Sequence, residues 1–144
     1  MKAILINPKL KLINEINYSG DYKDISKLTE CRIFTCVYPF DNCEDTIYLD
    51  DEGLLKQSNY CFTFDCDNGQ AQPLMGNALI LGTNDEGDSK DIETSLDEIK
   101  KRVSFKGHQK IIMGNSGIDL SPLPTILNDD DIKYIDNVNA WGQV

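Results

Sequence analysis

Short runs of alternating apolar and polar residues fill the first two-thirds of the chain and predict strands. Residues 2–7 are apolar on both faces, so we expect a central strand there. Residues 10–16 alternate as a half-exposed strand does. Residues 32–38 are rich in β-branched and aromatic side chains, which favours a strand, and residues 45–49 follow at the spacing of a hairpin partner.

The middle of the chain continues this strand pattern around a loop that is rich in turn residues. Residues 60–64 alternate and lead into Asp67-Asn-Gly69, where Asn-Gly tolerates the positive φ of a tight hairpin. We predict a loop with a kink over residues 70–77, because Pro73 cannot donate to a sheet ladder. The apolar run at residues 78–81 then predicts a buried strand.

Three segments carry helix signals. Asp21 is a suitable N-cap for a short helix over residues 22–29. Ser95-Leu-Asp-Glu98 forms a capping box ahead of apolar residues at helical spacing. Asn128 is expected to cap a last helix over residues 129–136.

These elements predict a single α+β domain with a mostly antiparallel sheet and two short helices in residues 1–107. Residues 108–144 are predicted to be a C-terminal extension with a short helix. The extension is too short to bury a core of its own, so it would pack on the core or on a partner subunit. Residues 110–113 would form an edge strand within it, and Trp141 would anchor it.

Acidity narrows the classes of partner. The chain has 144 residues, with 14 Lys and Arg against 24 Asp and Glu, for a net charge of −10. Binding of long nucleic acids is therefore disfavoured, because it needs clustered cations. Simple solubility, mimicry of nucleic acid and a small local pocket stay open. No apolar run is long enough for a membrane span, so we expect a cytoplasmic protein that does not bind membranes.

Candidate catalytic and metal-binding groups are sparse. The five cysteines form an odd number without zinc-site spacing, which predicts free thiols. His108 is the single imidazole, and the residues around it predict an ordinary surface histidine in a loop. The acidic turns at residues 65–69 and 84–88 do not match a calcium-binding loop. We therefore expect no catalytic residues, no metal and no cofactor.

A small nucleotide could still be held without a phosphate-binding loop, through amide groups, an aromatic platform and one or two cations. Suitable side chains lie near the predicted strand ends. Each also has a structural alternative, as a core edge, a turn residue or a solvated charge. The candidate ligand-binding residues are Asn7, Lys9, Arg32, Tyr38, Tyr60, Gln72, Pro73, Gly76 and Asn77.

Several short motifs in order resemble a known family. They are Met1-Lys-Ala-Ile-Leu-Ile-Asn-Pro8, Val37-Tyr-Pro-Phe40, Tyr48 to Lys56, Asn59-Tyr60 and Gln72 to Thr83. Together they resemble small phage and mobile-element proteins described as a domain of unknown function, number 3846, over about Met1 to Phe105. The resemblance implies a virus-related setting and an accessory role, and it brings no catalytic residues.

The leading hypothesis is a phage-encoded counter-defence protein that sequesters a small nucleotide-type immune signal without cleaving it, as a homo-oligomer in the infected bacterial cell. The alternative is an acidic inhibitor, such as a DNA mimic, that binds a host defence protein. Hydrolysis of a nucleotide is the least favoured hypothesis.

Overall fold

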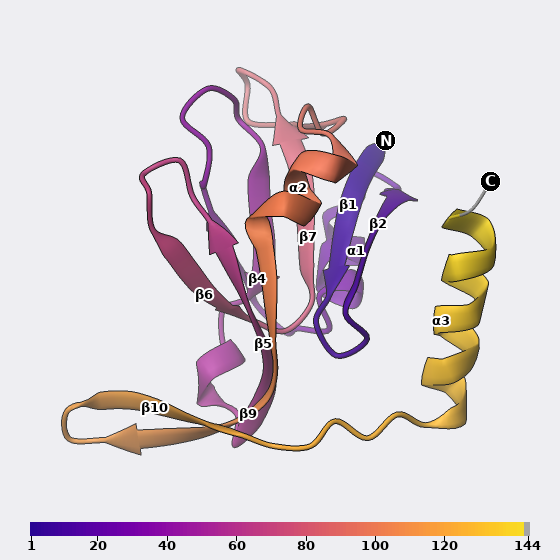
Figure 1. The fold of residues 1–144 in the computed structure, drawn as a ribbon. Coiled ribbons are helices and arrows are strands. Elements are labelled where there is room, and N and C mark those ends of the chain that lie inside the picture. The colour runs from indigo at the N-terminus through magenta and orange to yellow at the C-terminus, as the bar shows by residue number, and fades with distance from the viewer. Residues whose placement is uncertain (143–144) are drawn as a thin grey trace.

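The first of two antiparallel sheets contains the strands with the most continuous apolar sequence. The computed structural model describes residues 1–142 and the side chains of residues 1–137. The order of strands in the first sheet is β2-β1-β7-β4-β3, with the short β8 beside β7 (Figure 1). Its strands are β1 (Lys2–Asn7), β2 (Leu12–Asn17), β3 (Phe34–Val37), β4 (Thr46–Asp50), β7 (Ala78–Thr83) and β8 (Ser89–Lys90).

The second sheet has the order β10-β9-β5-β6. Strand β9 is long and pairs with β5 through its first part and with β10 through its last part. Strand β6 lies at the sheet edge, where a proline is tolerated. The strands are β5 (Ser58–Asp65), β6 (Ala71–Met75), β9 (Val103–Gly114) and β10 (Gly117–Pro122).

Both faces of the first sheet are buried, because successive side chains of a strand point to opposite faces. On one face, Ile4, Ile6 and Ile80 pack against Phe62 and Phe64 of the second sheet. On the other face, residues such as Leu5 and Leu79 pack against helix α1 and its flanking residues, with Ile25 and Tyr18 in contact. The apolar sequence of β1 and β7 is thus explained by their central positions.

Four helical segments complete the fold. Helix α1 (Tyr22–Leu28) is capped by Asp21, and α2 (Leu96–Arg102) by Ser95, whose hydroxyl accepts a hydrogen bond from the Glu98 N–H. Figure 1 shows α1 behind the first sheet and α2 across one end of the space between the sheets. The other two are a 3-10 turn, η1 (Gly53–Leu55), and α3 (Asp129–Gly142).

The structure confirms the α+β class and the predicted helix starts. It also corrects four details. Residues 71–75 form strand β6 and not a loop, and the strands divide into two sheets. His108 lies within β9 and not in a loop, and residues 110–113 pair with β10 as part of this strand, which crosses the boundary predicted at residue 107.

The C-terminal part of the chain extends beyond the compact part of the two sheets. The β9–β10 hairpin projects beyond the rest of the second sheet, and an extended segment leads from it to α3 beside β2 (Figure 1). The Trp141 side chain, predicted to anchor this part, lies outside the described side chains. Within residues 1–142, no helix has both the length and the apolar character needed to cross a membrane.

Candidate functional site

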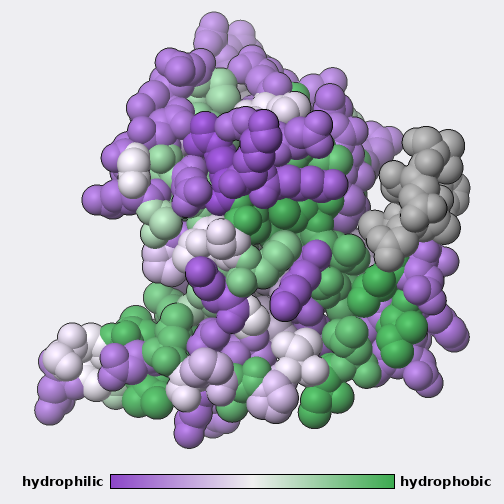
Figure 2. Space-filling view, in the orientation of Figure 1, coloured by the Kyte–Doolittle hydropathy of each residue, from purple (hydrophilic) through white to green (hydrophobic). Residues whose placement is uncertain are grey.

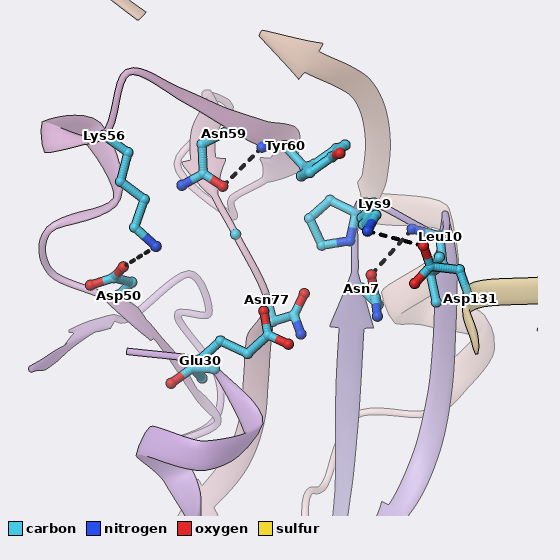
Figure 3. A pocket seen from close by; sticks show the side chains of 13 residues that line it. Asn7, Lys9, Leu10, Glu30, Asp50, Lys56, Asn59, Tyr60, Asn77 and Asp131 are labelled. Atoms are coloured by element: carbon cyan, nitrogen blue, oxygen red, sulfur yellow. Dashed lines mark hydrogen bonds and ion pairs between the residues drawn. The ribbon is translucent and has the colours of Figure 1, made fainter. Parts of the chain in front are cut away.

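A polar pocket of about 270 Å³ opens at one end of the first sheet (Figure 3). Antiparallel pairing brings the end of β1 beside the start of β7, and the end of β4 lies on the other side of β7. Polar residues that end or precede these strands therefore gather at one place. The lining residues are Asn7, Pro8, Lys9, Leu10, Thr29, Glu30, Asp50, Lys56, Asn59, Tyr60, Gly76, Asn77 and Asp131.

Three asparagines of the pocket are each fixed by a hydrogen bond to the main chain. Asn7 Oδ1 accepts from the Leu10 N–H at 3.2 Å, and Asn77 Nδ2 donates to the Leu28 carbonyl at 3.3 Å. Asn59 is buried and bonds to the Gly53 carbonyl and the Tyr60 N–H. Among the described residues, Asn7 Nδ2 and Asn77 Oδ1 make no hydrogen bond, so these two oriented side chains offer a free amide donor group and a free carbonyl acceptor.

Gly76 turns the chain from β6 into β7 beside these amides. Its φ is +81°, a conformation that glycine adopts without strain. The Gly76 N–H donates to the Tyr60 carbonyl at 2.9 Å, which ties the turn to β5. A glycine is therefore required here by the backbone conformation, and this conformation places Asn77 at the pocket.

Tyr60 supplies the aromatic group of the pocket. Its ring stacks on the His108 imidazole across the β5–β9 pair, with centroids 4.4 Å apart and an angle of 18° between the planes. Stacking on one side restricts the tyrosine rotamer. The Tyr60 ring is thus held in place as it lines the pocket.

Two lysines bring positive charge to the pocket, and each is paired with an aspartate (Figure 3). Lys9 Nζ lies 3.0 Å from Asp131 in the first turn of α3, and Lys56 Nζ lies 3.1 Å from the buried Asp50. Glu30 adds a carboxylate that makes no ion pair within the described side chains. An anion that enters must therefore compete with a resident carboxylate for each lysine.

The contact between Lys9 and Asp131 changes the pKa of both groups. The hydrogen bond from Lys9 to Asp131 raises the pKa of Lys9. The hydrogen bond that Asp131 accepts from the Asn128 N–H lowers the pKa of Asp131, and the hydrogen bond from Lys9 lowers it further. Asn128 Oδ1 in turn accepts from the Asp131 N–H at 2.8 Å, which confirms the predicted cap. The cap of α3 thus holds Asp131 in the charged form over Lys9.

The pocket brings together some of the residues predicted from the sequence. Asn7, Lys9, Tyr60, Gly76 and Asn77 line it. The structure does not place the other four there. Gln72 and Pro73 line a separate hollow beside β3 and β4, Arg32 pairs with Glu52 in a third hollow, and Tyr38 is 73% exposed.

Apart from Lys9, the charged residues of the pocket were missed by sequence reasoning. Asp50 and Lys56 lie within the Tyr48-to-Lys56 motif, and their position at the end of a predicted strand could have indicated them as binding residues. Glu30 has a positive φ of 53°, which no local motif indicates. Asp131 lies near the other end of the chain, and no sequence motif predicts its contact with Lys9.

His108 forms a second polar cluster next to the pocket. Its Nδ1 lies 3.1 Å from the Pro124 carbonyl, which can only accept, so Nδ1 carries the proton. In the neutral ring Nε2 then accepts from the Ser58 hydroxyl at 2.9 Å. Neither Ser58 nor His108 lines the pocket. The cluster joins β5, β9 and the segment that leads to α3, which is a structural role for the imidazole.

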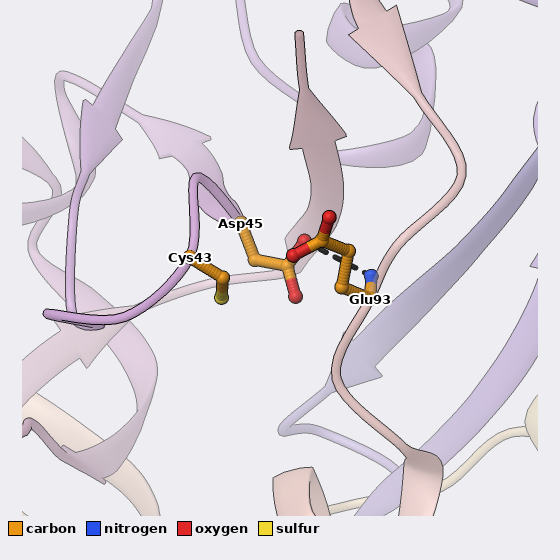
Figure 4. A group of neighbouring side chains, drawn as sticks. All are labelled: Cys43, Asp45 and Glu93. Carbon is orange, nitrogen blue, oxygen red and sulfur yellow. Dashed lines mark hydrogen bonds between the residues drawn. The ribbon is translucent and has the colours of Figure 1, made fainter.

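Cys43, Asp45 and Glu93 gather their ligand atoms within 4.8 Å of one another (Figure 4). Asp45 is buried and accepts hydrogen bonds from the N–H groups of Glu93 and Thr94 and from the Thr94 hydroxyl. Burial raises the pKa of the Cys43 thiol. The carboxylate of Asp45 is thus occupied in holding the loop before α2, and the group is explained as a structural tie.

All five cysteines are free, as predicted. Burial raises the pKa of the Cys36, Cys61 and Cys66 thiols as well, which keeps these groups protonated at neutral pH. Since the thiolate is the reactive form, these cysteines are packing residues.

Comparison with known proteins finds a family match. A family model described as "Domain of unknown function (DUF3846)" matches residues 1–104, close to the region in which the motifs show their resemblance. No curated protein and no solved structure matches the chain. The matched region contributes every residue of the polar pocket except Asp131.

Proposed function

Since the chain belongs to the DUF3846 family, a family described as a domain of unknown function, we propose a function from the chemistry of the polar pocket. The protein binds a small nucleotide-type ligand there and sequesters it without cleaving it. The observation that carries this proposal is the gathering of Asn7, Lys9, Tyr60, Gly76 and Asn77, which lie far apart in sequence, around one cavity.

The groups of the pocket complement the parts of a nucleotide. The free donor of Asn7 and the free acceptor of Asn77 match the edge of a nucleobase, which presents both kinds of group. The Tyr60 ring offers an aromatic surface, and Lys9 and Lys56 are cations suited to phosphate. Small-molecule pockets span roughly 300–1,000 Å³, and a cavity of about 270 Å³ lies just below this range, so it suits a mononucleotide better than a larger ligand.

Capture without cleavage is supported by the residue types at the pocket. Its described lining contains amides, carboxylates, lysines, a threonine and a tyrosine, with neither imidazole nor thiol among them. A nucleophile needs a base that can take its proton, and imidazole is the commonest such group. The pocket is thus better equipped for binding than for chemistry.

Charge sets a condition on the ligand. A phosphate that reaches Lys9 must replace the Asp131 carboxylate, which lies 3.0 Å from the ammonium group. Free carboxylate groups such as that of Glu30 repel an anion at the same time. A ligand that also forms the base-edge hydrogen bonds would offset this repulsion, whereas inorganic phosphate alone would not.

The biological setting follows from the family resemblance. Small accessory proteins of phages counter bacterial immunity, and capture of a nucleotide signal is one way to do so. We therefore place the protein, as a proposal, in the cytoplasm of an infected bacterium, where it lowers the free concentration of such a signal.

Calorimetry against a panel of mononucleotides, cyclic nucleotides and ADP-ribose derivatives tests the proposal. We expect binding of at least one member, recovered unchanged by mass analysis after incubation. Lys9→Ala should weaken binding at least tenfold, whereas Lys23→Ala, which removes the same charge from an exposed position of α1, should not. No heat of binding across the panel, or equal losses in both variants, would contradict it.

A second function is favoured by a different observation, the acidity of the surface. The net charge is −10, and the exposed turn with Asp85, Glu86 and Asp88 concentrates carboxylates. Such a surface suits docking on a basic defence protein, as a DNA mimic does. Docking of this kind should weaken steeply as salt rises, and capture of a ligand in the pocket should weaken much less, so a salt series on any partner separates the two.

A further inference from the structure

Glu30 stands at the edge of the polar pocket with a strained backbone. Helix α1 ends in a Schellman motif, in which the Glu30 N–H donates to the Lys27 carbonyl at 3.3 Å. The Cys31 N–H donates to the Ser26 carbonyl at 3.0 Å in the same motif. Glu30 occupies the left-handed position, with φ +53°, where glycine is the usual residue. Because a Cβ is disfavoured in this conformation, glutamate destabilises the fold here relative to glycine.

The Glu30 carboxylate lines the pocket without a partner. In the described part of the chain it forms no ion pair and accepts no hydrogen bond. The end of α1 does not need this carboxylate, since the Schellman motif is made by main-chain groups. Strain that is kept at a residue with an unused functional group, on the wall of a cavity, indicates a role in binding.

Glu30 lies beside the two amides that have free groups. Continuing the β1–β7 register by one residue places Asn7 opposite Asn77. Asn77 in turn bonds to the Leu28 carbonyl, two residues before Glu30. Figure 3 shows the Glu30 side chain extending toward Asn77, with Asn7 on the other side of Asn77. The row therefore offers a donor group from Asn7, an acceptor from Asn77 and a charged acceptor from Glu30.

We infer that the pocket recognises guanine and that Glu30 is the residue that selects this base, an inference that rests on the nucleotide capture proposed above. The edge of guanine presents an acceptor, O6, followed by two adjacent donor groups, N1–H and the N2 amino group. Asn7 donates to O6, Asn77 accepts from N1–H, and Glu30 accepts from the N2 amino group. Guanine thus supplies a separate donor group for each acceptor, whereas adenine and cytosine have one amino group for both and uracil has a single N–H.

Charge fixes the orientation of such a ligand. The Glu30 carboxylate repels a phosphate, so the base lies against it and the phosphate lies away from it. Lys9 follows Asn7 by two residues and lies on the Asn7 side of Asn77 in Figure 3, away from Glu30. A carboxylate that hinders binding of a free anion therefore favours a ligand that carries guanine at one end and phosphate at the other.

Calorimetry with guanosine, inosine and adenosine monophosphates tests the inference. Inosine monophosphate differs from the guanosine compound only by the missing N2 amino group. Wild-type protein should bind guanosine monophosphate at least about tenfold more tightly than either of the others, because each leaves an acceptor of the site unpaired. Glu30→Gln should abolish most of this preference. Glu15→Gln removes the same charge from an exposed position of β2 outside the pocket and should keep it.

Glu30→Gly separates binding from folding. Glycine adopts the left-handed conformation without strain, so the midpoint of thermal denaturation should rise. The preference for guanosine monophosphate should be lost in the same variant. A glutamate that served only the fold would give the opposite pattern, a lower midpoint with the preference kept, and this result would overturn the inference.

The outcomes distinguish this inference from the proposed function. Equal affinities of the wild type for guanosine and inosine monophosphates overturn the guanine assignment and leave nucleotide capture in place. A preference that persists in Glu30→Gln, or that is lost in Glu15→Gln, overturns the assignment as well. Absence of binding to all three compounds also overturns it, and the wider panel of cyclic nucleotides and ADP-ribose derivatives then decides the proposed function separately.

Discussion

The body of the molecule (residues 1–104) and its C-terminal arm (residues 111–142) bury their apolar side chains to very different degrees. In the body, the first sheet is covered on one face by the second sheet and on the other by α1. In the arm, apolar side chains such as Met113 and Ile118 of the β9–β10 hairpin and Ile132 of α3 stay exposed (Figure 2), and an ion pair from Lys9 to Asp131 ties α3 to the body. The body can therefore be stable through its own core, whereas the arm depends on a few polar contacts and on what covers it.

Body and arm both line the polar pocket, so the difference in their packing bears on ligand binding. The body supplies the oriented amides, the aromatic ring and the lysines, and the arm supplies the carboxylate that neutralises Lys9. A loosely packed element that holds a competing charge can be displaced at little cost in core packing. A ligand that replaces Asp131 would thus loosen α3 and leave the body intact.

The largest expected difference in stability is between an Ile→Ala substitution in the body and one in the arm. Ile80→Ala removes a fully buried side chain from β7 and should lower the free energy of unfolding by about 2–5 kcal/mol. Ile126→Ala in the exposed segment before α3 should change it by less than about 0.5 kcal/mol. Urea denaturation measures both values, and similar losses in the two variants would remove the distinction between body and arm.

Backbone strain should give a smaller contrast. Gly76 in the body has φ +81°, so Gly76→Ala is expected to cost about 1–2 kcal/mol. Gly114, at the tip of the β9–β10 hairpin, has no positive φ. A Cβ added there by substitution would contact only the Gly117 carbonyl, at 3.6 Å. Gly114→Ala should therefore be close to neutral in thermal denaturation. A neutral Gly76→Ala would show that the turn at the pocket is not fixed as described.

Removal of the competing carboxylate should sharpen the link between arm and pocket. Asp131→Asn leaves Lys9 without its partner and should raise the affinity for a phosphate-bearing ligand several-fold. Asp130→Asn removes the same charge from the neighbouring position, which does not line the pocket, and should change the affinity little. Calorimetry with one ligand on both variants decides, and equal affinities would separate α3 from the site.

The pH dependence of the arm is the smallest expected effect. The lowered pKa of Asp131 means that its contribution is present above about 3.9 and is lost as pH falls through the lowered value. The raised pKa of Lys9 means that its contribution is present below about 10.4 and is lost as pH rises through the raised value. The amide signal of Asp131 in NMR should hence stay constant between about pH 5 and pH 9, and a midpoint within this range would contradict the ion pair.

Sequence patterns predicted the parts of the fold that depend on neighbouring residues. The two-sided apolar run of β1 indicated a central strand, the apolar run of β7 indicated a buried strand, and the caps Asp21, Ser95 and Asn128 marked three helix starts. Strand β6 was not predicted, because Pro73 indicated a loop, although an edge strand tolerates proline. The division into two sheets was not predicted either, since pairing of β5 with β9 joins residues that are 39 to 52 positions apart.

The candidate site was likewise predictable where it depends on neighbouring residues, and not where it depends on the tertiary fold. Residues at strand ends, such as Asn7 and Asn77, were predictable as polar groups next to buried strands, and the structure brings them together. Arg32 and Tyr38 carried the right chemistry, but they lie just outside the two ends of β3 and face solvent away from the pocket. Asp131 could not have been found, because only the tertiary fold places the arm over Lys9.

The central claim is that the polar pocket captures a nucleotide-type molecule, and one measurement tests it most directly. Wild-type protein and the Asn77→Leu variant are each incubated with extract of infected bacteria, repurified and heat-denatured, and the released small molecules are identified by mass spectrometry. The account predicts that an intact nucleotide-type species is released from the wild type and is depleted at least tenfold from the variant. Identical profiles from the two proteins would contradict it.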